Sequence, residues 1–308
     1  MSLPRREFLA ATAALTFASE AANAAETAAV KIAATASESA SNVFYAMELG
    51  FFTKNGLDVD LQVLSNSGAY ASGIISGAFD VGAISTGSVV VAHERNLPFV
   101  VLANGGVYSD ASPTTYLCVL RGSPIRTAAD FKGKTIGVST LGDITQAAVF
   151  GWLQHERVDY RAVNFVEMSP FLMVAALQQG RIDGALIGEP ALTPGLDALT
   201  LLAPAYSTIA RRFAIVEWVT SRTWAAANPA VVNRLQTAFS QASAWAMDNR
   251  VQAGEILAKY AKLSPSLVQR MHHVDWVPGA SASLLQPVII VMAKYGFISK
   301  AFGAQELF

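Results

Sequence analysis

Residues 77–84, GAFDVGAI, return 103 positions later as residues 180–187, GRIDGALI. In both copies a glycine ends a helical stretch, an aspartate follows three residues later, and an apolar run leads into a loop. The flanking segments repeat in the same order, with Lys31 matched by Lys134 and Val63 by Val166. A repeat of both residues and element order predicts two similar lobes.

Strand-like and helical runs alternate from Val30 to about Ala210, which predicts an α/β fold with parallel sheets. Two extended, β-rich segments, 114–120 and 213–221, join the copies and suggest a two-segment hinge. The chain after Thr223 reads as helical, with Asn228 as a cap and Pro229 at a first helical position. We therefore expect lobe 1 at 28–113 plus 223–308, lobe 2 at 118–216, and a hinge at 114–117 and 217–222.

The composition excludes several classes of protein. Of 308 residues, 52% are hydrophobic and 15% are charged, against roughly 25% charged in average proteins, so intrinsic disorder is excluded. The net charge of −1 and the lack of a Lys/Arg-rich run argue against nucleic-acid binding. The uncharged stretches 61–79 and 276–293 are interrupted by Gly, Ser, Asn or Pro, which membrane spans rarely are. A single cysteine, Cys118, excludes an internal disulfide.

The first residues have the pattern of a targeting signal. Arg5-Arg6 precede Phe8-Leu9, an uncharged stretch covers 10–19, and Ala22-Asn23-Ala24 fits a small-x-small cleavage pattern. This arrangement looks like a twin-arginine export signal at 1–24, cleaved after about Ala24 to leave a periplasmic chain. A frayed amphipathic helix is the alternative.

Small polar residues gather where the strands of both lobes are expected to end. In open α/β sheets ligands bind beyond the carboxyl ends of the strands, where helices begin. The predicted cleft residues are Ser37, Ser39 and Asn42; Ser65, Asn66, Ser67 and Gly68; Ser85, Thr86, Gly87 and Ser88; and Thr140, Leu141, Gly142, Asp143 and Glu189. Plain helix capping explains any one of them. Their clustering in loops of both lobes favours ligand binding.

Enzyme signatures are missing from the sequence. It contains no G-x-S-x-G, G-x-x-x-x-G-K-[ST], G-x-G-x-x-G or H-E-x-x-H motif. Its histidines, His93, His155, His272 and His273, fall within or at the ends of helices and are expected at the surface. We predict no catalytic residue, no metal site and no cofactor.

Two carboxylates of the cleft loops have alternative roles. Asp143 and Glu189 would accept hydrogen bonds from a ligand amine, ring N–H or hydroxyl. Alternatively, Asp143 caps the helix that begins near Ile144, and Glu189 simply ends a strand before Pro190.

Five segments resemble a known family: 46–59 (AMELGFFTKNGLDV), 76–82 (SGAFDVG), 130–138 (DFKGKTIGV), 176–185 (ALQQGRIDGA) and 188–190 (GEP). They are similar to substrate-binding proteins of ABC transporters in the nitrate/sulfonate/taurine group, which also includes thiamine-pyrimidine-synthase-like proteins. The resemblance implies a two-lobed type II periplasmic binding fold. It also implies a monomeric receptor that closes on a small solute and delivers it to an inner-membrane permease.

The family's ligand loops correspond to the cleft residues named above. Tyr108 and Trp218 lie near the two crossings, where they would cover a ligand or pack the hinge. The loops contain no Lys or Arg, which favours a bulkier organic ligand over nitrate; sulfonate, carboxylate, taurine-like zwitterion and pyrimidine remain open. A thiamine-pyrimidine-type enzyme would need a cysteine-rich motif and an active-site histidine, which the sequence lacks. That enzyme and a periplasmic sensor partner are the alternatives.

Overall fold

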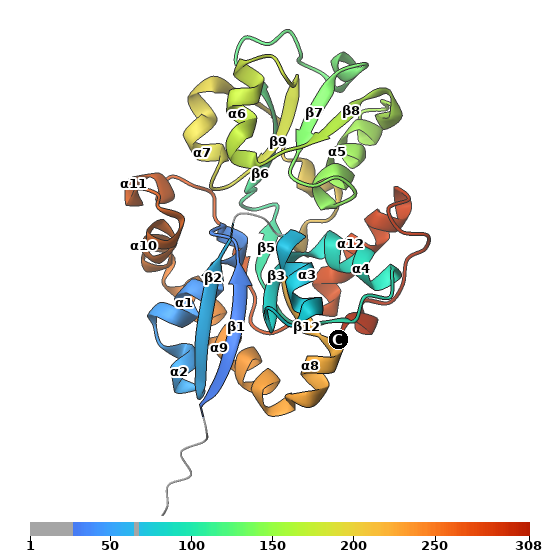
Figure 1. The fold of residues 1–308 in the computed structure, drawn as a ribbon. Coiled ribbons are helices and arrows are strands. Elements are labelled where there is room, and N and C mark those ends of the chain that lie inside the picture. The colour runs from blue at the N-terminus through green and yellow to red at the C-terminus, as the bar shows by residue number, and fades with distance from the viewer. Residues whose placement is uncertain (1–26, 65–67) are drawn as a thin grey trace, which may run out of the picture.

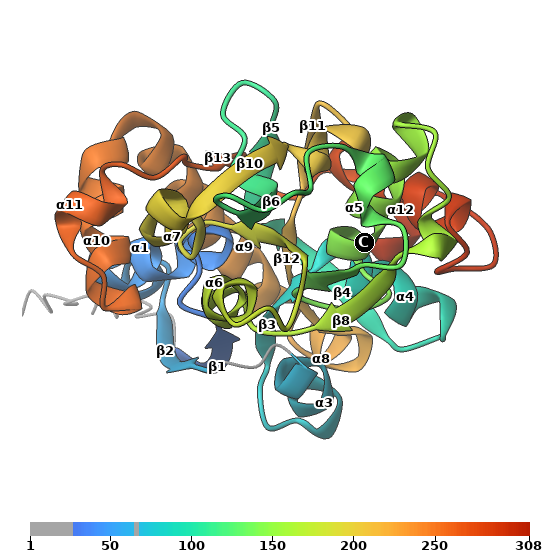
Figure 2. The ribbon, with the colours of Figure 1, turned by 90° about the horizontal axis from the view of Figure 1, so that it is seen from above.

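The computed structural model describes residues 27–64 and 68–308. The expected export signal and the predicted cleft residues Ser65, Asn66 and Ser67 lie outside this range. Two α/β lobes are stacked, each around a five-stranded sheet (Figure 1). Seen from above, the second lobe lies over the middle of the first, with α10 and α11 on one side and α12 on the other (Figure 2).

The strands form three sheets. The first has the order β2 (Leu57–Val63), β1 (Ala28–Ala34), β3 (Val81–Ser85), β12 (Val216–Ser221) and β4 (Phe99–Asn104). The second has the order β10 (Leu199–Ala203), β6 (Thr115–Leu120), β9 (Gly184–Gly188), β7 (Thr135–Val138) and β8 (Asn164–Glu167). The third, smaller sheet has the order β11 (Arg212–Ala214), β5 (Gly106–Ser109) and β13 (Asp275–Trp276).

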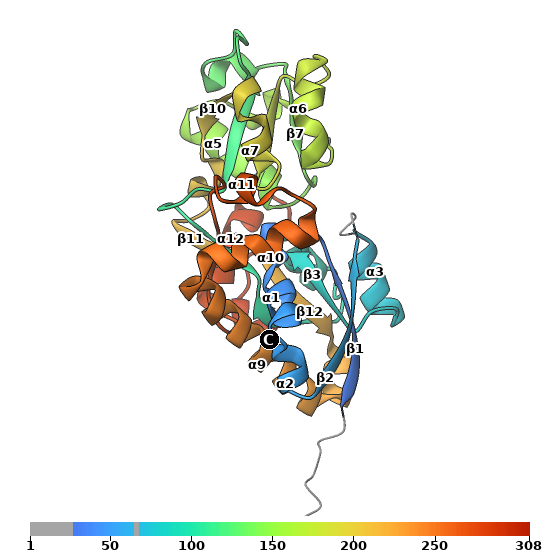
Figure 3. The same cartoon turned by 90° about the vertical axis from the view of Figure 1, so that its left-hand side faces the viewer.

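Helices cover both large sheets. The second lobe contains α5 (Ile144–His155), α6 (Pro170–Gln178) and α7 (Leu192–Gly195). The first contains α1 (Asn42–Glu48), α2 (Phe51–Lys54), α3 (Gly68–Ser76), α4 (Thr86–Glu94), α8 (Arg222–Ala227), α9 (Pro229–Asp248), α10 (Arg250–Ala261), α11 (Pro265–Val268) and α12 (Ala282–Lys294). Short 3-10 turns are η1 (Glu38–Ala40), η2 (Ala128–Phe131), η3 (Tyr160–Ala162), η4 (Leu196–Ala198), η5 (Ala205–Thr208) and η6 (Ala304–Leu307). Helix α11 lies at the level where the lobes meet (Figures 1 and 3). Within the two described ranges, no helix has both the length and the apolar character of a membrane span.

The repeated aspartate has the same role in both lobes. Asp80 Oδ2 accepts the main-chain N–H of Lys31 at 2.8 Å, and Asp183 Oδ2 accepts that of Thr135 at 2.9 Å. Each aspartate therefore fastens the start of one strand, β3 or β9, to its parallel neighbour, β1 or β7. This shared bond explains why the residue recurs at the same place in the repeat, and the two copies lie in different sheets as expected.

The crossings between the lobes differ from the expected hinge. Thr115–Leu120 is strand β6 of the second sheet, and Val216–Ser221 is strand β12 inside the first sheet. The predicted hinge at 217–222 is therefore wrong, and residues 212–216 belong with the first lobe's sheets. The run VEWVTS is buried on both faces, so its sequence does not distinguish a central strand from an extended linker.

The two crossings instead meet at the small sheet. The chain leaves β5 through 110–114 to reach β6, and it returns from β10 through 204–211 to reach β11. Strands β5 and β11 are paired antiparallel, and the N–H of Asp110 donates to the carbonyl of Arg211 at 3.0 Å. The outgoing and returning chains are thus fixed side by side where they leave the first lobe.

Candidate ligand-binding site

The first turns of two helices from different lobes meet at one carboxylate. Helix α4 follows β3 in the first lobe, and α5 follows β7 in the second. The Ser85 hydroxyl donates to Asp143 Oδ1 at 2.8 Å, and the Ser88 hydroxyl donates to Oδ2 at 2.6 Å. The N–H of Ile144 also donates to Oδ1, so Asp143 caps α5. Loops from both lobes therefore converge on a side chain that is 2% exposed.

A glycine permits this close approach. A Cβ at Gly87 would overlap Asp143 Oδ1 and lie 2.9 Å from the main-chain nitrogen of Ile144. Gly142, with φ of +71°, turns the chain immediately before Asp143. Its N–H donates to Gln146 Oε1 at 2.8 Å. These two positions need glycine for different reasons, one for space and one for backbone conformation.

Among the described residues, Asp143 has hydrogen-bond donors around it but no cationic partner. Burial raises the pKa of its carboxyl group, while the hydrogen bonds from Ser88, Ile144 and Ser85 lower it. The nearby Glu167 carboxylate raises the pKa further. Hydroxyl and main-chain N–H groups thus offset part of the cost of burying this carboxylate.

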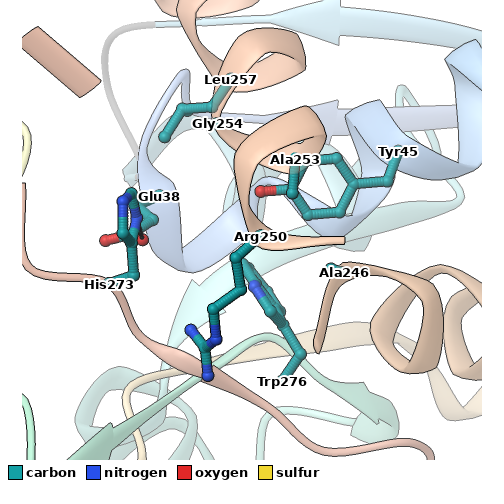
Figure 4. Close-up of a pocket in the computed structure, with 9 residues that line it drawn as sticks. All are labelled: Glu38, Tyr45, Ala246, Arg250, Ala253, Gly254, Leu257, His273 and Trp276. Atoms are coloured by element: carbon teal, nitrogen blue, oxygen red, sulfur yellow. Dashed lines mark hydrogen bonds and ion pairs between the residues drawn. The ribbon is translucent and has the colours of Figure 1, made fainter. Parts of the chain in front are cut away.

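A second carboxylate lies at the loop between β1 and α1. Glu38 is 3% exposed; its Oε1 accepts from His273 Nδ1 at 2.6 Å and from the N–H of Val274 at 3.2 Å. Its Oε2 is buried and has no hydrogen-bond partner within residues 27–64 and 68–308. Figure 4 shows Glu38 beside His273, with Arg250 and Trp276 nearby. The cavity among these side chains has a volume of about 10 Å³, too small for an organic ligand.

A third carboxylate, Glu189, follows β9. Its Oε1 accepts from the Thr193 hydroxyl at 2.5 Å and its Oε2 from the Thr193 N–H at 3.1 Å. Burial raises the pKa of Glu189, as does the charge of Glu38, whereas the N–H of His272 lowers it. The segment 272–274 is therefore contacted by a carboxylate from each lobe.

Histidine 273 is not the free surface residue expected from the sequence. Its hydrogen bond to Glu38 raises the pKa of the imidazole. No local sequence pattern indicates this pair, because its members lie 235 residues apart. In the described part of the chain, no three Asp, Glu, His or Cys side chains gather as a metal site requires.

Four predicted contacts are instead core residues: Asn42, Thr86, Tyr108 and Trp218 are fully buried. Asn42 Nδ2 donates to the Asn104 carbonyl and to Ser243 Oγ, both at 3.2 Å. Asn42 Oδ1 accepts from Trp218 Nε1 at 2.8 Å. Because these polar atoms have partners inside the first lobe, the predicted ligand contacts of Asn42 and Trp218 are corrected to structural roles.

The aromatic ring of Tyr108 is also part of the core. It packs against Tyr206 and Phe213, and its hydroxyl is 2.7 Å from Ser207 Oγ. The Thr86 hydroxyl donates to the Ala214 carbonyl at 2.7 Å. Of the two roles considered for Tyr108 and Trp218, the structure supports packing.

The remaining predicted residues surround the meeting point of the lobes. Ser37 and Ser39 are half-buried; Ser37 Oγ pairs with Thr35 Oγ1 at 3.0 Å, and the backbone of Ser39 packs against Gly105 and Gly106. Thr140 and Leu141 form the turn before Asp143, with the Leu141 N–H donating to Glu167 Oε2 at 2.9 Å. Gly68 begins α3. These positions remain candidates.

Cys118 does not have the character of a nucleophile. It lies buried in β6, and its thiol donates to the Tyr116 carbonyl at 3.3 Å. Burial raises the pKa of this thiol to about 12, so the reactive thiolate is scarce at neutral pH.

Known proteins are similar to this chain in sequence. A Brucella abortus protein named as a binding protein is 27% identical over 277 residues, 85% of this chain and 80% of that protein. The taurine-binding periplasmic protein of Escherichia coli is 26% identical over 188 residues, 61% of this chain and 55% of that protein.

Solved structures share the fold. The alkanesulfonate-binding protein SsuA of Xanthomonas axonopodis pv. citri, bound to MOPS, has a TM-score of 0.74 at 20% identity and covers 92% of this chain and 99% of that one. The desulfurization enzyme DSZB has a TM-score of 0.68 at 16% identity, covering 91% and 96%. The expected two-lobed binding-protein fold is confirmed, and so is the nitrate/sulfonate/taurine resemblance. Since the NMT1/THI5-like family model also matches residues 38–253, the chain belongs to the NMT1/THI5-like family.

Proposed function

We propose that this chain is the exported, monomeric substrate-binding receptor of an ABC importer. It binds one small organic molecule between its lobes and delivers it to an inner-membrane permease. The observation that carries the proposal is the convergence of Ser85, Ser88 and Asp143 from two hinged lobes. Two lobes joined by a hinge form a site that closes around a ligand, and relatives named as binding proteins support the same function.

We infer binding without turnover. The chain's only cysteine is a buried thiol, and His273 is engaged with Glu38. The carboxylate at the lobe contact, Asp143, has no neighbouring nucleophile among its partners, which are Ser85, Ser88 and Ile144. The serine hydroxyls donate to a carboxylate and have no histidine base in this cluster, so the arrangement does not match activated nucleophiles. Because DSZB shares the fold, the fold alone does not decide between binding and catalysis.

The proposal is tested with the purified mature chain. Its thermal unfolding is followed with taurine, alkanesulfonates, small carboxylates and aminopyrimidines, and any material co-purified with it is identified by mass spectrometry after denaturation. We expect one solute class to raise the melting temperature with rising concentration and to be recovered unchanged. A chemically altered solute would favour the enzyme alternative, and a melting temperature unmoved by every class would contradict the receptor function.

A further inference from the structure

The position best suited to an oxyanion in this protein is already filled by a side chain of the protein. Two helices begin there, α4 with nine residues and α5 with twelve. The amino end of a helix carries partial positive charge and free N–H groups that stabilise anions. The Ser85 and Ser88 hydroxyls add two more donors from the opposite lobe. The carboxylate of Asp143 accepts from both hydroxyls and from the N–H of Ile144.

Little room remains beside this carboxylate. Asp143 is 2% exposed, and Gly87 lies so close that even a Cβ would overlap Oδ1. Three donors are therefore satisfied by an internal anion, and the lobes approach each other around it.

We propose that Asp143 is a specificity-determining residue that takes the place of a ligand oxyanion. The ligand is then a neutral or positively charged small organic molecule that offers N–H donors, and not a sulfonate, sulfate or nitrate. This inference rests on the receptor function proposed above and narrows its ligand class.

The surrounding charges favour the same class. Besides Asp143, the lobe-facing loops carry Glu38 and Glu189, and the loops 37–42, 85–88, 140–143 and 188–193 contain no Lys or Arg. The nearby Arg250 is paired with Asp275 at 3.1 Å, and His273 is paired with Glu38. An entering anion would therefore meet like charge without a free cation in these loops, which disfavours its binding.

Unused acceptors are also present. Glu38 Oε2 is buried in a side chain that is 3% exposed, and it has no partner. Glu38 is near enough to Glu189, on the other lobe, for its charge to act on that carboxyl group. An acceptor without a donor at this loop disfavours an approaching anion and favours a solute that carries N–H groups.

The test is a gain of oxyanion binding. Asp143→Ser keeps a favoured N-cap residue on α5 but removes the carboxylate, leaving the Ser85 and Ser88 hydroxyls and the Ile144 N–H open. Methanesulfonate and inorganic sulfate are titrated by calorimetry. We expect Asp143→Ser to bind at least about tenfold more tightly than the wild type, the ratio that one charge-assisted hydrogen bond gives.

Two control variants accompany it. Asp143→Asn keeps the size of the side chain and should gain no oxyanion binding. Asp159→Ala removes another capping aspartate, one that accepts from the Arg161 N–H at 3.0 Å on η3, and it should also gain none. Circular dichroism verifies that each variant is folded.

The outcomes of these titrations decide the proposal. A folded Asp143→Ser chain without the gain overturns it, and so does a wild type that binds methanesulfonate as tightly as the variant. If Asp143→Ser does not fold, the wild type decides: methanesulfonate binding with a Kd below about 1 mM overturns the proposal, and binding of an aminopyrimidine or alkylamine alone supports it. A wild type that binds no solute of any class contradicts the receptor function. The increase in methanesulfonate affinity of Asp143→Ser can be measured without knowing the natural ligand, so the two proposals fail separately.

Discussion

The hydroxyl of Ser88 donates to the carboxylate of Asp143 over 2.6 Å, and these two residues belong to different lobes. Ser88 lies in the first turn of α4, and Asp143 caps α5. The contact uses groups of the protein alone, so the lobes can approach at this point without a ligand. Substitutions here should therefore change lobe closure more than the stability of either lobe.

Gly87→Ala tests this separation. The added Cβ would overlap Asp143 Oδ1 across the lobe contact, and overpacking of this kind costs about 1–3 kcal/mol. We expect ligand affinity to fall by about tenfold or more and the radius of gyration in small-angle scattering to increase. Gly303→Ala is the matched control, because the nearest atom to its Cβ is 3.8 Å away. Equal affinity and equal size in Gly87→Ala would show that the lobes do not close here.

Glu217→Gln should stabilise the protein at neutral pH. Glu217 is fully buried in β12; the Thr86 hydroxyl donates to its Oε1 at 3.3 Å, and its Oε2 has no partner. Burial raises the pKa of this carboxyl group well above its ordinary value. The protonated form is therefore favoured in the folded chain, and this stabilisation is present below the ordinary glutamate pKa and lost as pH rises through the raised one.

Urea unfolding of both proteins from pH 4 to 8 measures this effect. The stability of Glu217→Gln relative to wild type should increase with pH, by about 1.4 kcal/mol per pH unit between the unfolded and folded pKa values. Glu255→Gln, at an exposed position on α10, should show no such trend. A difference between Glu217→Gln and wild type that does not change with pH would contradict the raised pKa.

The Glu38–His273 pair should be visible in a histidine titration. The hydrogen bond that His273 donates to Glu38 raises the pKa of His273 above the ordinary value of about 6.5. This pair therefore stabilises the folded protein fully below about pH 6.5 and less as pH rises through the raised pKa. Other groups near this pair are Tyr45, Arg250 and Glu189. Substitution of Glu38 alone leaves them in place, so a change in the pKa of His273 reports the contact with Glu38.

NMR of the imidazole protons provides the measurement. The His273 pKa should fall towards about 6.5 in Glu38→Gln, and His273→Gln assigns the resonance. An unchanged His273 pKa in Glu38→Gln would remove Glu38 as the cause.

Cys118 should be unreactive in the folded protein. Its thiol is buried and its pKa is raised to about 12, so a thiol reagent at pH 7 should label it only after denaturation. Cys118→Ala should keep full ligand binding. Rapid labelling of the native chain, or a binding defect in a folded Cys118→Ala variant, would indicate that Cys118 has a functional role.

The repeat made the arrangement of the lobes predictable. Asp80 and Asp183 recur because each fastens the equivalent pair of parallel strands in its own lobe, so a local sequence pattern indicated a tertiary hydrogen bond. The hinge was not predictable in the same way. Both Thr115–Leu120 and Val216–Ser221 have the residue types of an extended segment, and only pairing with neighbouring strands shows that they belong to sheets.

The candidate site was predicted in part for a similar reason. Ser85 and Ser88 follow β3 in the first lobe and Asp143 follows β7 in the second, so the loops that meet come after strands at different positions in the repeat. Residue type near a crossing does not reveal which face of a strand carries a side chain, and Trp218 proved to point into the core, stacked on Phe239. Glu38 and His273 lie 235 residues apart in the sequence, so no local pattern indicates their contact.

The hydrogen bond between Asp110 and Arg211 has a consequence for the motion of the lobes. It ties the two crossings together at the edge of the small sheet, so rotation must take place beyond it, in 111–114 and 204–210. Pro113 fixes one backbone dihedral of the first crossing, and η5 occupies part of the second. Few rotatable bonds are left, and they lie next to each other. We therefore expect the lobes to open by rotation about a short axis near Asp110 and Arg211.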